Sequence, residues 1–309
     1  MCRLNQILML KKIQIAFSSC RRESAKSWGY ALRWSTRRFY YRFIKRYFSG
    51  NIFSDPTDQD REITVVIPAA EKDAPVLAHC LKSVKMMVRH RLSSILVVAP
   101  ESELLKQISL EAGVTFIFED EILPIPASEL NCRGWLLQQF IKLNTAFHVS
   151  TKDYLVLDAD TVFLKPQTFF CSGKTVLRYA DQYELLYNRS LQMTLGHARR
   201  FPVSFVTHHM VLNVGRVKKL IGHIERQNKQ PWYEYILGNI DEQHNHKISF
   251  SEYELYGNYI VTQPAWRRNF RVEYWHGQEA CAEDVTRLKQ ILRGMDGKIN
   301  TISFHQHTQ

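Results

Sequence analysis

Two aspartates separated by a single residue follow a short apolar run near the middle of the chain. Asp158 and Asp160 come directly after residues 154–157, which read Tyr-Leu-Val-Leu. These residue types favour a buried β-strand, and ligands of α/β sheets bind at the carboxyl ends of the strands. Hard divalent cations prefer carboxylate oxygens and can bridge a protein to the phosphates of a substrate. The spacing therefore predicts a metal site that binds a substrate with a diphosphate.

The segments before this motif alternate between strands and helices. Short apolar runs predict the strands, and a helical spacing of apolar residues predicts the helices. The expected order is strand 63–68, helix 74–88, strand 94–99, helix 101–112, strand 114–118 and helix 133–147. Such alternation predicts an α/β fold with a mostly parallel sheet, flanked by helices and joined by right-handed crossovers. The two aspartates then follow roughly the fourth strand of this sheet.

The second half of the chain has a less regular pattern. Strands are expected at its beginning and end, with several helices between them. The expected elements are strand 175–179, helices 182–195, 217–227, 232–237, 253–260 and 284–292, and strand 299–304.

Three segments resemble glycosyltransferases with the GT-A fold. Residues 157–166 (LDADTVFLKP) are similar to the D-x-D segment of glycogenin-like enzymes. Residues 134–143 (GWLLQQFIKL) and 251–259 (SEYELYGNY) resemble a little-characterised bacterial group described as glycosyltransferases. The resemblance covers about residues 62–309 and implies a GT-A-like (Rossmann-like) domain. It also implies transfer of a sugar from a nucleotide-sugar donor, with UDP-linked donors favoured, to a glycan or lipid-linked acceptor.

The resemblance further implies which residues hold the metal. A Mn²⁺ or Mg²⁺ ion held by Asp160, with Asp158 on the ion or on the ribose, would stabilise the departing diphosphate. In related enzymes a histidine near the C-terminus completes the metal shell, which makes His305 and His307 candidates. The alternative for these two histidines is a polar tail without a ligand, since the last residues of a chain are often poorly ordered.

The helix before the motif and the end of the first strand are expected to border the nucleotide. Gln138 and Lys142 are four residues apart and share a helix face. Lys142 is then expected to reach a phosphate, and Gln138 or Gln139 to contact sugar hydroxyls, whereas the alternative is a solvated helix face. The remaining candidates for nucleotide contact are Arg133, Pro68 and Ala69.

Acidic and histidine pairs in the second half are candidates for catalysis. Glu252 and Glu254 would share a face on a strand but diverge by about 200° on a helix. One of them, with Glu254 preferred, is expected to take the proton of the acceptor hydroxyl. The alternative is that they cap a helix or form salt bridges. Residues 241–242 (Asp-Glu) are the substitute base. At most one of His208 and His209 faces the transferred sugar if both lie on a strand, and His208 is assigned here.

The net charge of +11 belongs entirely to the first fifty residues. That segment holds twelve Lys and Arg and one Glu, so the remainder of the 309-residue chain is neutral. The expected organisation is a basic, aromatic and helical N-terminal extension (1–50), a polar linker (51–61) and one domain (62–309). Basic and aromatic residues on a helix suit an anionic membrane surface or a partner protein, and packing against the domain is the plainer alternative. Single-stranded nucleic acid is the least favoured ligand.

The sequence also favours a cellular location. No apolar run approaches the ~20 residues of a membrane-spanning helix. Six scattered cysteines without a C-x-x-C spacing argue against a zinc knuckle or a disulfide framework and favour thiols in a reducing compartment. The expected location is the cytoplasm, at the periphery of the inner face of a membrane.

Two other functions compete with sugar transfer. A haloacid-dehalogenase-like phosphatase also places an Asp-x-Asp after an apolar strand and would use Asp158 as its nucleophile. That motif opens its domain, whereas three strands precede it here. The second alternative is a non-catalytic protein that keeps this fold and binds a membrane or a partner, because a fold does not guarantee an activity.

Overall fold

The computed structural model describes residues 35–45, 56–130, 132, 134–180, 185–240, 250–281 and 299–305. The chain divides into two units, residues 1–50 and 51–309. In the first unit, residues 35–45 are helical and end in a π-helix, Tyr40–Lys45. Within the described ranges, no helix combines the length and the apolar character that crossing a membrane requires.

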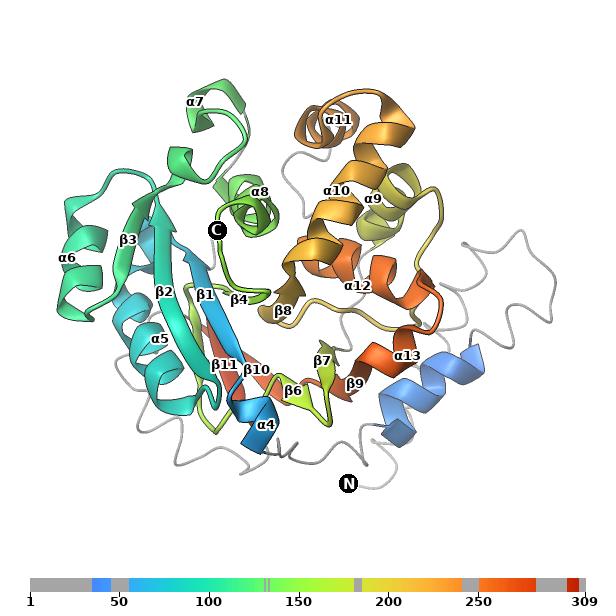
Figure 1. The fold of residues 1–309 in the computed structure, drawn as a ribbon, viewed down its shortest axis with the longest axis horizontal. Helices are drawn as coiled ribbons and strands as arrows, with labels where there is room; N and C mark the ends of the chain where they lie inside the picture. The colour runs from blue at the N-terminus through green and yellow to red at the C-terminus, as the bar shows by residue number, and fades with distance from the viewer. Residues whose placement is uncertain are drawn as a thin grey trace. The chain divides into compact units, whose positions relative to one another are not determined.

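The second unit is built on a five-stranded sheet with the order β3-β2-β1-β4-β8 (Figure 1). Strands β3, β2, β1 and β4 pair in parallel, and β8 pairs with β4 in the antiparallel direction. Helices lie between the parallel strands along the chain, so the expected α/β fold with a mostly parallel sheet is confirmed. The strands are β1 (Glu62–Pro68), β2 (Arg91–Ala99), β3 (Thr115–Phe118), β4 (Asp153–Leu157) and β8 (His209–Asn213).

The three longest helices between the parallel strands begin or end at recognisable local signals in two cases. They are α5 (Ala74–Met87), α6 (Glu103–Glu111) and α8 (Gly134–Asn144). Pro75 lies in the first turn of α5, where its missing N–H costs no hydrogen bond. The Ser102 hydroxyl caps α6 by accepting from Leu105 N. Gly113, with a φ of 58°, ends α6 in the left-handed conformation that glycine adopts most readily.

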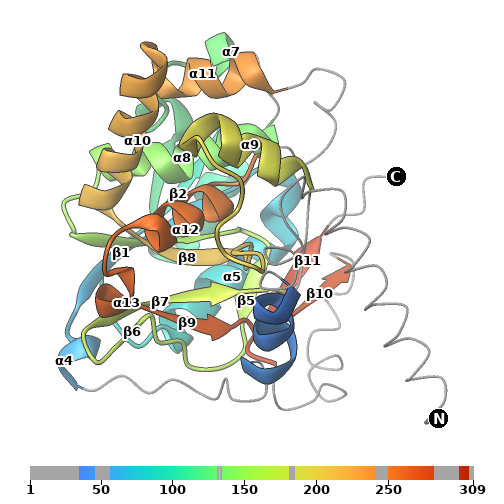
Figure 2. The same ribbon diagram turned by 90° about the vertical axis from the view of Figure 1, so that its right-hand side faces the viewer.

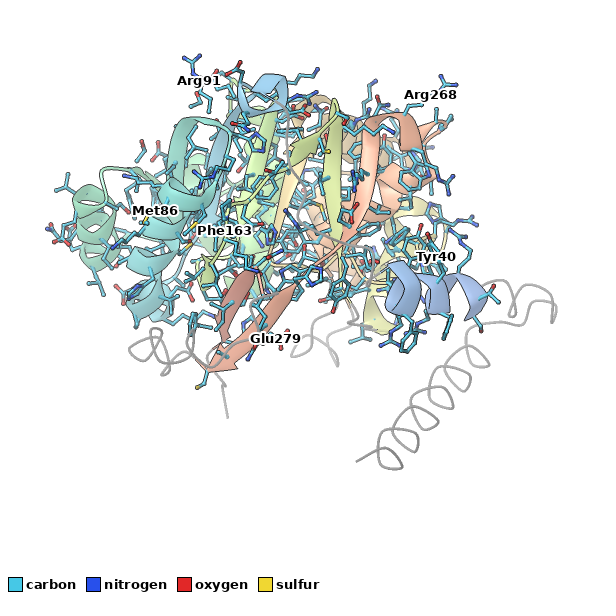
Figure 3. The ribbon with its side chains drawn as sticks, turned by 90° about the horizontal axis from the view of Figure 1, so that it is seen from below. Tyr40, Met86, Arg91, Phe163, Arg268 and Glu279 are labelled. Carbon is cyan, nitrogen blue, oxygen red and sulfur yellow. The ribbon has the colours of Figure 1, made fainter. Side chains whose placement is uncertain are left out.

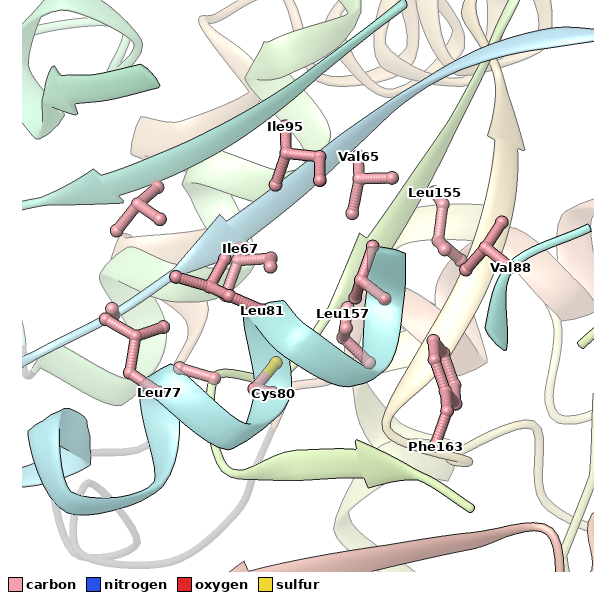
Figure 4. Close-up of a cluster of buried hydrophobic side chains, with 14 of the residues drawn as sticks. Val65, Ile67, Leu77, Cys80, Leu81, Val88, Ile95, Leu155, Leu157 and Phe163 are labelled. Atoms are coloured by element: carbon pink, nitrogen blue, oxygen red, sulfur yellow. The ribbon is translucent and has the colours of Figure 1, made fainter. Parts of the chain in front are cut away.

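The two faces of the central sheet are covered by different helices. Odd-numbered residues of β1 and β4 pack against α5, among them Val65, Ile67, Leu155 and Leu157 (Figure 4). Successive side chains of a strand alternate between the faces, and the Tyr154 hydroxyl donates to the Lys142 carbonyl of α8 at 2.9 Å. The even-numbered side chains of β4 therefore point to the α8 face, where Asp158 follows.

Two three-stranded sheets complete the second unit, with the orders β10-β11-β5 and β6-β7-β9 (Figure 2). Strand β11 is antiparallel to β5 and parallel to β10, so the end of the described chain lies beside the residues after Asp160. The sequence predicts β7 and β11 but not the other four. The six strands are β5 (Thr161–Phe163), β6 (Phe170–Cys171), β7 (Lys174–Tyr179), β9 (Phe270–Tyr274), β10 (Gly277–Cys281) and β11 (Thr301–His305).

The remaining helices follow the predicted pattern between residues 185 and 262, whereas three short helices, at 56–59, 127–130 and 266–269, are not predicted by the sequence. Part of the expected linker forms helix α4, and Asp58 within it is buried because its carboxylate accepts from Gly173 N at 3.2 and 3.3 Å. The helix expected at 284–292 lies outside the described residues. The helices are α4 (Pro56–Gln59), α7 (Ala127–Leu130), α9 (Leu185–Leu195), α10 (Val214–Asn228), α11 (Trp232–Asn239), α12 (Glu252–Thr262) and α13 (Trp266–Asn269).

Candidate functional site

The Asp-x-Asp pair leaves the carboxyl end of β4, where the sequence predicts it. Val66 of β1 pairs with Val156 of β4, so the end of β1 at Pro68 lies level with Asp158. Asp158 N donates to the His208 carbonyl at 2.9 Å, and the Asp158 carbonyl accepts from Thr161 N at 3.0 Å. These backbone bonds define a tight turn that presents both aspartates at the end of the sheet.

Three side chains hold the Asp158 carboxylate. Lys142 Nζ and the Tyr253 hydroxyl, the latter at 3.0 Å, donate to Oδ1, while His208 Nδ1 lies 3.0 Å from Oδ2. Burial would raise the pKa of the Asp158 carboxyl, but the Lys142 ammonium and the His208 hydrogen bond outweigh it and hold that pKa well below its usual range. Asp158 is therefore an anion in a fixed orientation.

Lys142 is enclosed rather than directed at a ligand. Its side chain is 2% exposed, its ammonium lies 2.7 Å from Glu252 Oε1, and the Tyr253 ring lies beneath it at 4.5 Å. Burial would lower the pKa of Lys142, but the charges of Asp158 and Glu252 outweigh it and raise that pKa above its usual range. The sequence predicts that Lys142 contacts a phosphate. In the structure its ammonium is instead paired with the carboxylates of Asp158 and Glu252.

The other residues expected at the nucleotide are mostly engaged within the fold. Gln139 is buried, and its side-chain oxygen accepts from Glu252 N at 3.4 Å at the beginning of α12. Pro68 and Ala69 are also buried, and Ala69 N donates to the Val98 carbonyl at 2.9 Å. Gln138 is partly exposed. Arg133 lies outside the described residues.

The structure corrects the assignment of Glu254 as a catalytic base. Its side chain is 1% exposed, and its carboxylate accepts from Arg199 Nη2 at 3.0 Å, Ser204 Oγ at 2.6 Å and Phe205 N at 3.1 Å. Glu252 is likewise buried and pairs with Lys142, so neither glutamate is open to an acceptor. Both residues lie in the first turn of a helix, where side chains two positions apart diverge. The two glutamates therefore contact different neighbours.

The adjacent histidines separate as expected. His208 contacts Asp158, whereas His209 begins β8 and packs between the rings of Phe163 and Phe169 in the core. Burial would lower the pKa of His208, but the hydrogen bond to Asp158 and the neighbouring carboxylates raise it to about 9. Burial and the nearby Arg178 lower the pKa of His209 well below its usual value. Only His208 therefore belongs to the site.

The last described strand brings a second histidine to the second aspartate. Phe304 N donates to the Asp160 carbonyl at 2.9 Å, and His305 Nδ1 lies 3.0 Å from Asp160 Oδ2. Glu279, labelled in Figure 3, lies on β10, the edge strand of the same three-stranded sheet. One potential ligand atom from each of His208, Glu279 and His305 lies within 4.8 Å of the other two. We call Asp158, Asp160, His208, Glu279 and His305 the carboxylate–imidazole cluster.

Sequence reasoning misses three residues of this region. Glu279 is a member of the cluster, and Tyr253 contacts it through Asp158. Burial raises the pKa of Asp73 to about 6, and the nearby charges of Asp160 and Asp158 add to this effect. Tyr253 is adjacent to the predicted Glu252 within the SEYELYGNY segment, which is a usable signal. Glu279 has no comparable motif around it. His307 and the substitute base at 241–242 lie outside the described residues.

Comparison with protein-family models gives a match over most of the described domain. The protein-family model described as "Family of unknown function (DUF6492)" matches residues 60–292, which is most of the chain. No curated protein matches the sequence at a significant level.

Proposed function

The chain belongs to the DUF6492 family, whose function is unknown, and we propose from its own residues that it is a metal-dependent glycosyltransferase. Its donor would be a nucleotide-sugar, with a UDP-linked sugar favoured, and its acceptor a glycan or a lipid-linked glycan. The observation that carries this proposal is the position of Asp158 and Asp160 at the carboxyl end of β4, beside His305 of the last described strand. This is the part of an α/β sheet where ligands bind.

The residues of the carboxylate–imidazole cluster fit a divalent cation. They offer carboxylate oxygens and imidazole nitrogens, which are ligands for Mn²⁺ and other divalent metals. His208 Nε2 is buried and has no hydrogen-bond partner among the described residues, as a nitrogen reserved for a ligand would be. When bound, the ion would offset the negative charge that develops on the departing nucleoside diphosphate.

Several residues of the chain would prepare this site rather than contact the donor. Lys142 and Tyr253 hold Asp158 at Oδ1, and Glu252 in turn holds Lys142. Residues fixed by buried partners keep a reactive geometry without reorganisation during the reaction. The same contacts disfavour the phosphatase alternative, because three donors stabilise the negative charge of Asp158 and thereby weaken it as a nucleophile.

The N-terminal extension would bring the enzyme to its acceptor. Phe39, Tyr40 and Phe43 are exposed large apolar side chains in the described part of the first unit, and Arg37 is exposed beside them. Basic and aromatic side chains on one short helix suit an anionic membrane surface. We propose a cytoplasmic protein that binds the inner face of a membrane, where lipid-linked acceptors are found.

The test combines ligand binding with turnover. The melting temperature of the purified full chain is measured with a panel of nucleoside diphosphates and nucleotide-sugars, with and without Mn²⁺. A ligand that binds only the native state raises the melting temperature, so one nucleoside diphosphate should do so in a metal-dependent way. Asp160→Asn should reduce that shift and the release of nucleoside diphosphate from the donor, whereas the exposed Glu103→Gln of α6 should not. Phosphate release from a simple phosphoester, without any nucleotide shift, would favour the phosphatase instead.

A further inference from the structure

The two histidines of the cluster are held in the same way. His208 Nδ1 lies 3.0 Å from Asp158 Oδ2, and His305 Nδ1 lies 3.0 Å from Asp160 Oδ2. A carboxylate oxygen accepts, so each Nδ1 carries the proton of this bond, and Nε2 is the nitrogen that can bind a metal once any second proton leaves the ring. The centroids of the two rings are 5.0 Å apart. Each aspartate of the Asp-x-Asp pair therefore orients one imidazole.

The remaining nitrogen of His208 lies near a third potential ligand. His208 Nε2 is 3.9 Å from Glu279 Oε1, which is beyond hydrogen-bond range, and potential ligand atoms of His208, Glu279 and His305 lie within 4.8 Å of one another. His208 Nε2 is buried without a hydrogen-bond partner among the described residues. Leaving a buried polar atom unsatisfied is unfavourable, and a ligand between these three side chains would remove that cost.

The surrounding structure fixes the histidines and the glutamate. His208 adopts a φ of 61°, a left-handed conformation that is uncommon for residues other than glycine and is often found at functional sites. Its ring packs against Trp275, with the centroids 5.2 Å apart. Glu279 of β10 pairs with Ser303 in β11, two residues before His305, so strand pairing sets their separation.

We propose that His208 Nε2, His305 Nε2 and the Glu279 carboxylate bind one divalent transition-metal ion, and that Asp158 and Asp160 act as positioning residues behind the two imidazoles. Carboxylate–histidine–metal arrangements of this type are common, and two histidines with one glutamate are an established ligand set. This assignment differs from the ligands expected from the sequence, where the aspartates themselves hold the ion. It rests on the proposed function only in placing a metal at the same site.

The ligand types also select the class of metal. Mg²⁺ prefers oxygen ligands in an octahedral arrangement, whereas imidazole nitrogens suit transition metals, among which Zn²⁺ binds more tightly than Mn²⁺. The site should therefore bind Mn²⁺ in the presence of excess Mg²⁺.

The full chain is stripped with a chelator and titrated with Mn²⁺, and the free ion is followed by electron paramagnetic resonance. The wild type should bind one Mn²⁺ per chain. Glu279→Gln and His208→Gln should weaken binding more than Asp160→Asn, whose loss should be about 10- to 100-fold because it removes an orienting group. Glu103→Gln should bind as the wild type does. Because Glu279 is half exposed, its substitution should leave the fold intact, and circular dichroism checks this.

Wild-type Mn²⁺ affinity in Glu279→Gln would overturn the proposal. So would a loss of binding in Asp160→Asn that exceeds the loss in Glu279→Gln, since the aspartate would then be the ligand. The measurement does not depend on turnover. Mn²⁺ binding with this order of variants supports the metal site even where no nucleotide-sugar binds, and that result would count against the glycosyltransferase alone.

Discussion

Lys142 Nζ lies 2.7 Å from Glu252 Oε1, and the same ammonium donates to Asp158. Lys142 belongs to helix α8 and Glu252 to helix α12, and both side chains are buried. A single cation thus joins two helices to the end of β4. Its charge offsets two carboxylates that would otherwise be buried together.

Replacing Lys142 by methionine should destabilise the protein strongly. Removing one partner of a buried ion pair costs about 3 to 5 kcal/mol, because the other charge is left without compensation. Lys142→Met removes the cation that compensates two carboxylates. Urea unfolding measures the change in free energy. The control is Lys106→Met on α6, which removes surface ion pairs and should change stability little. Equal midpoints for the two variants would contradict the role given to Lys142.

Glu254→Gln should affect stability rather than chemistry. Its carboxylate accepts from Arg199 and Ser204 in the interior, so the amide removes a negative charge that faces a buried guanidinium. We expect a loss of about 3 to 5 kcal/mol in the free energy of unfolding. The turnover per folded molecule, measured well below the melting temperature, should stay within about twofold of the wild type. A large fall in turnover with unchanged stability would restore Glu254 as the base.

Gly257 should be required by packing. A Cβ atom at this position of α12 would lie 2.3 Å from Cδ2 and 2.4 Å from Cγ of the buried Phe205 ring. Overpacking of this kind costs about 1 to 3 kcal/mol, so Gly257→Ala should lower the melting temperature. The matched control is Gly238→Ala in α11, where the described residues outside its own helix backbone place no atom within 4 Å of the new Cβ and alanine should be neutral or stabilising. A stabilised Gly257→Ala would show that α12 and Phe205 can separate without cost.

His90 should make the fold sensitive to acid. Its Nδ1 donates to the Asp58 carbonyl at 3.0 Å and its Nε2 accepts from Phe169 N at 2.8 Å, so the folded protein holds the neutral ring. Burial lowers the pKa of His90 from 6.5 to about 4. Between these values the unfolded chain binds a proton that the folded chain does not. Stability is therefore fully present above pH 6.5 and falls by up to about 3 kcal/mol towards pH 4.

Urea unfolding of His90→Gln at pH 7.5, 6 and 5 checks this dependence. The variant should be less stable at pH 7.5 but should lose less stability on acidification than the wild type. His79→Gln, at an exposed position of α5, should keep the wild-type pH dependence. If the unfolding free energy of His90→Gln depended on pH as that of the wild type does, the acid sensitivity would belong to other groups.

Local pattern was sufficient for the regular elements of the first half. The apolar runs of β1, β2 and β4 and the helical spacing of α5 are signals carried by neighbouring residues, so each element could be predicted within a few residues. The short strands β5, β6, β9 and β10 could not. All four have no more than five residues and no clear alternation, and the formation of β5, β9 and β10 depends on partners that are distant in the sequence.

The sequence by itself determined that Asp158 and Asp160 emerge together at the end of a buried strand, because the strand and its spacing are local. Only the tertiary structure decided which residues meet them. Side chains alternate between the two faces of β4, which directs Asp158 towards Lys142. The pairing of β11 with β5 brings His305 to Asp160. Helix α12 buries Glu254 in the interior, whereas β10 places Glu279 at the cluster. Such contacts depend on the packing of distant elements, which residue types and spacing do not encode.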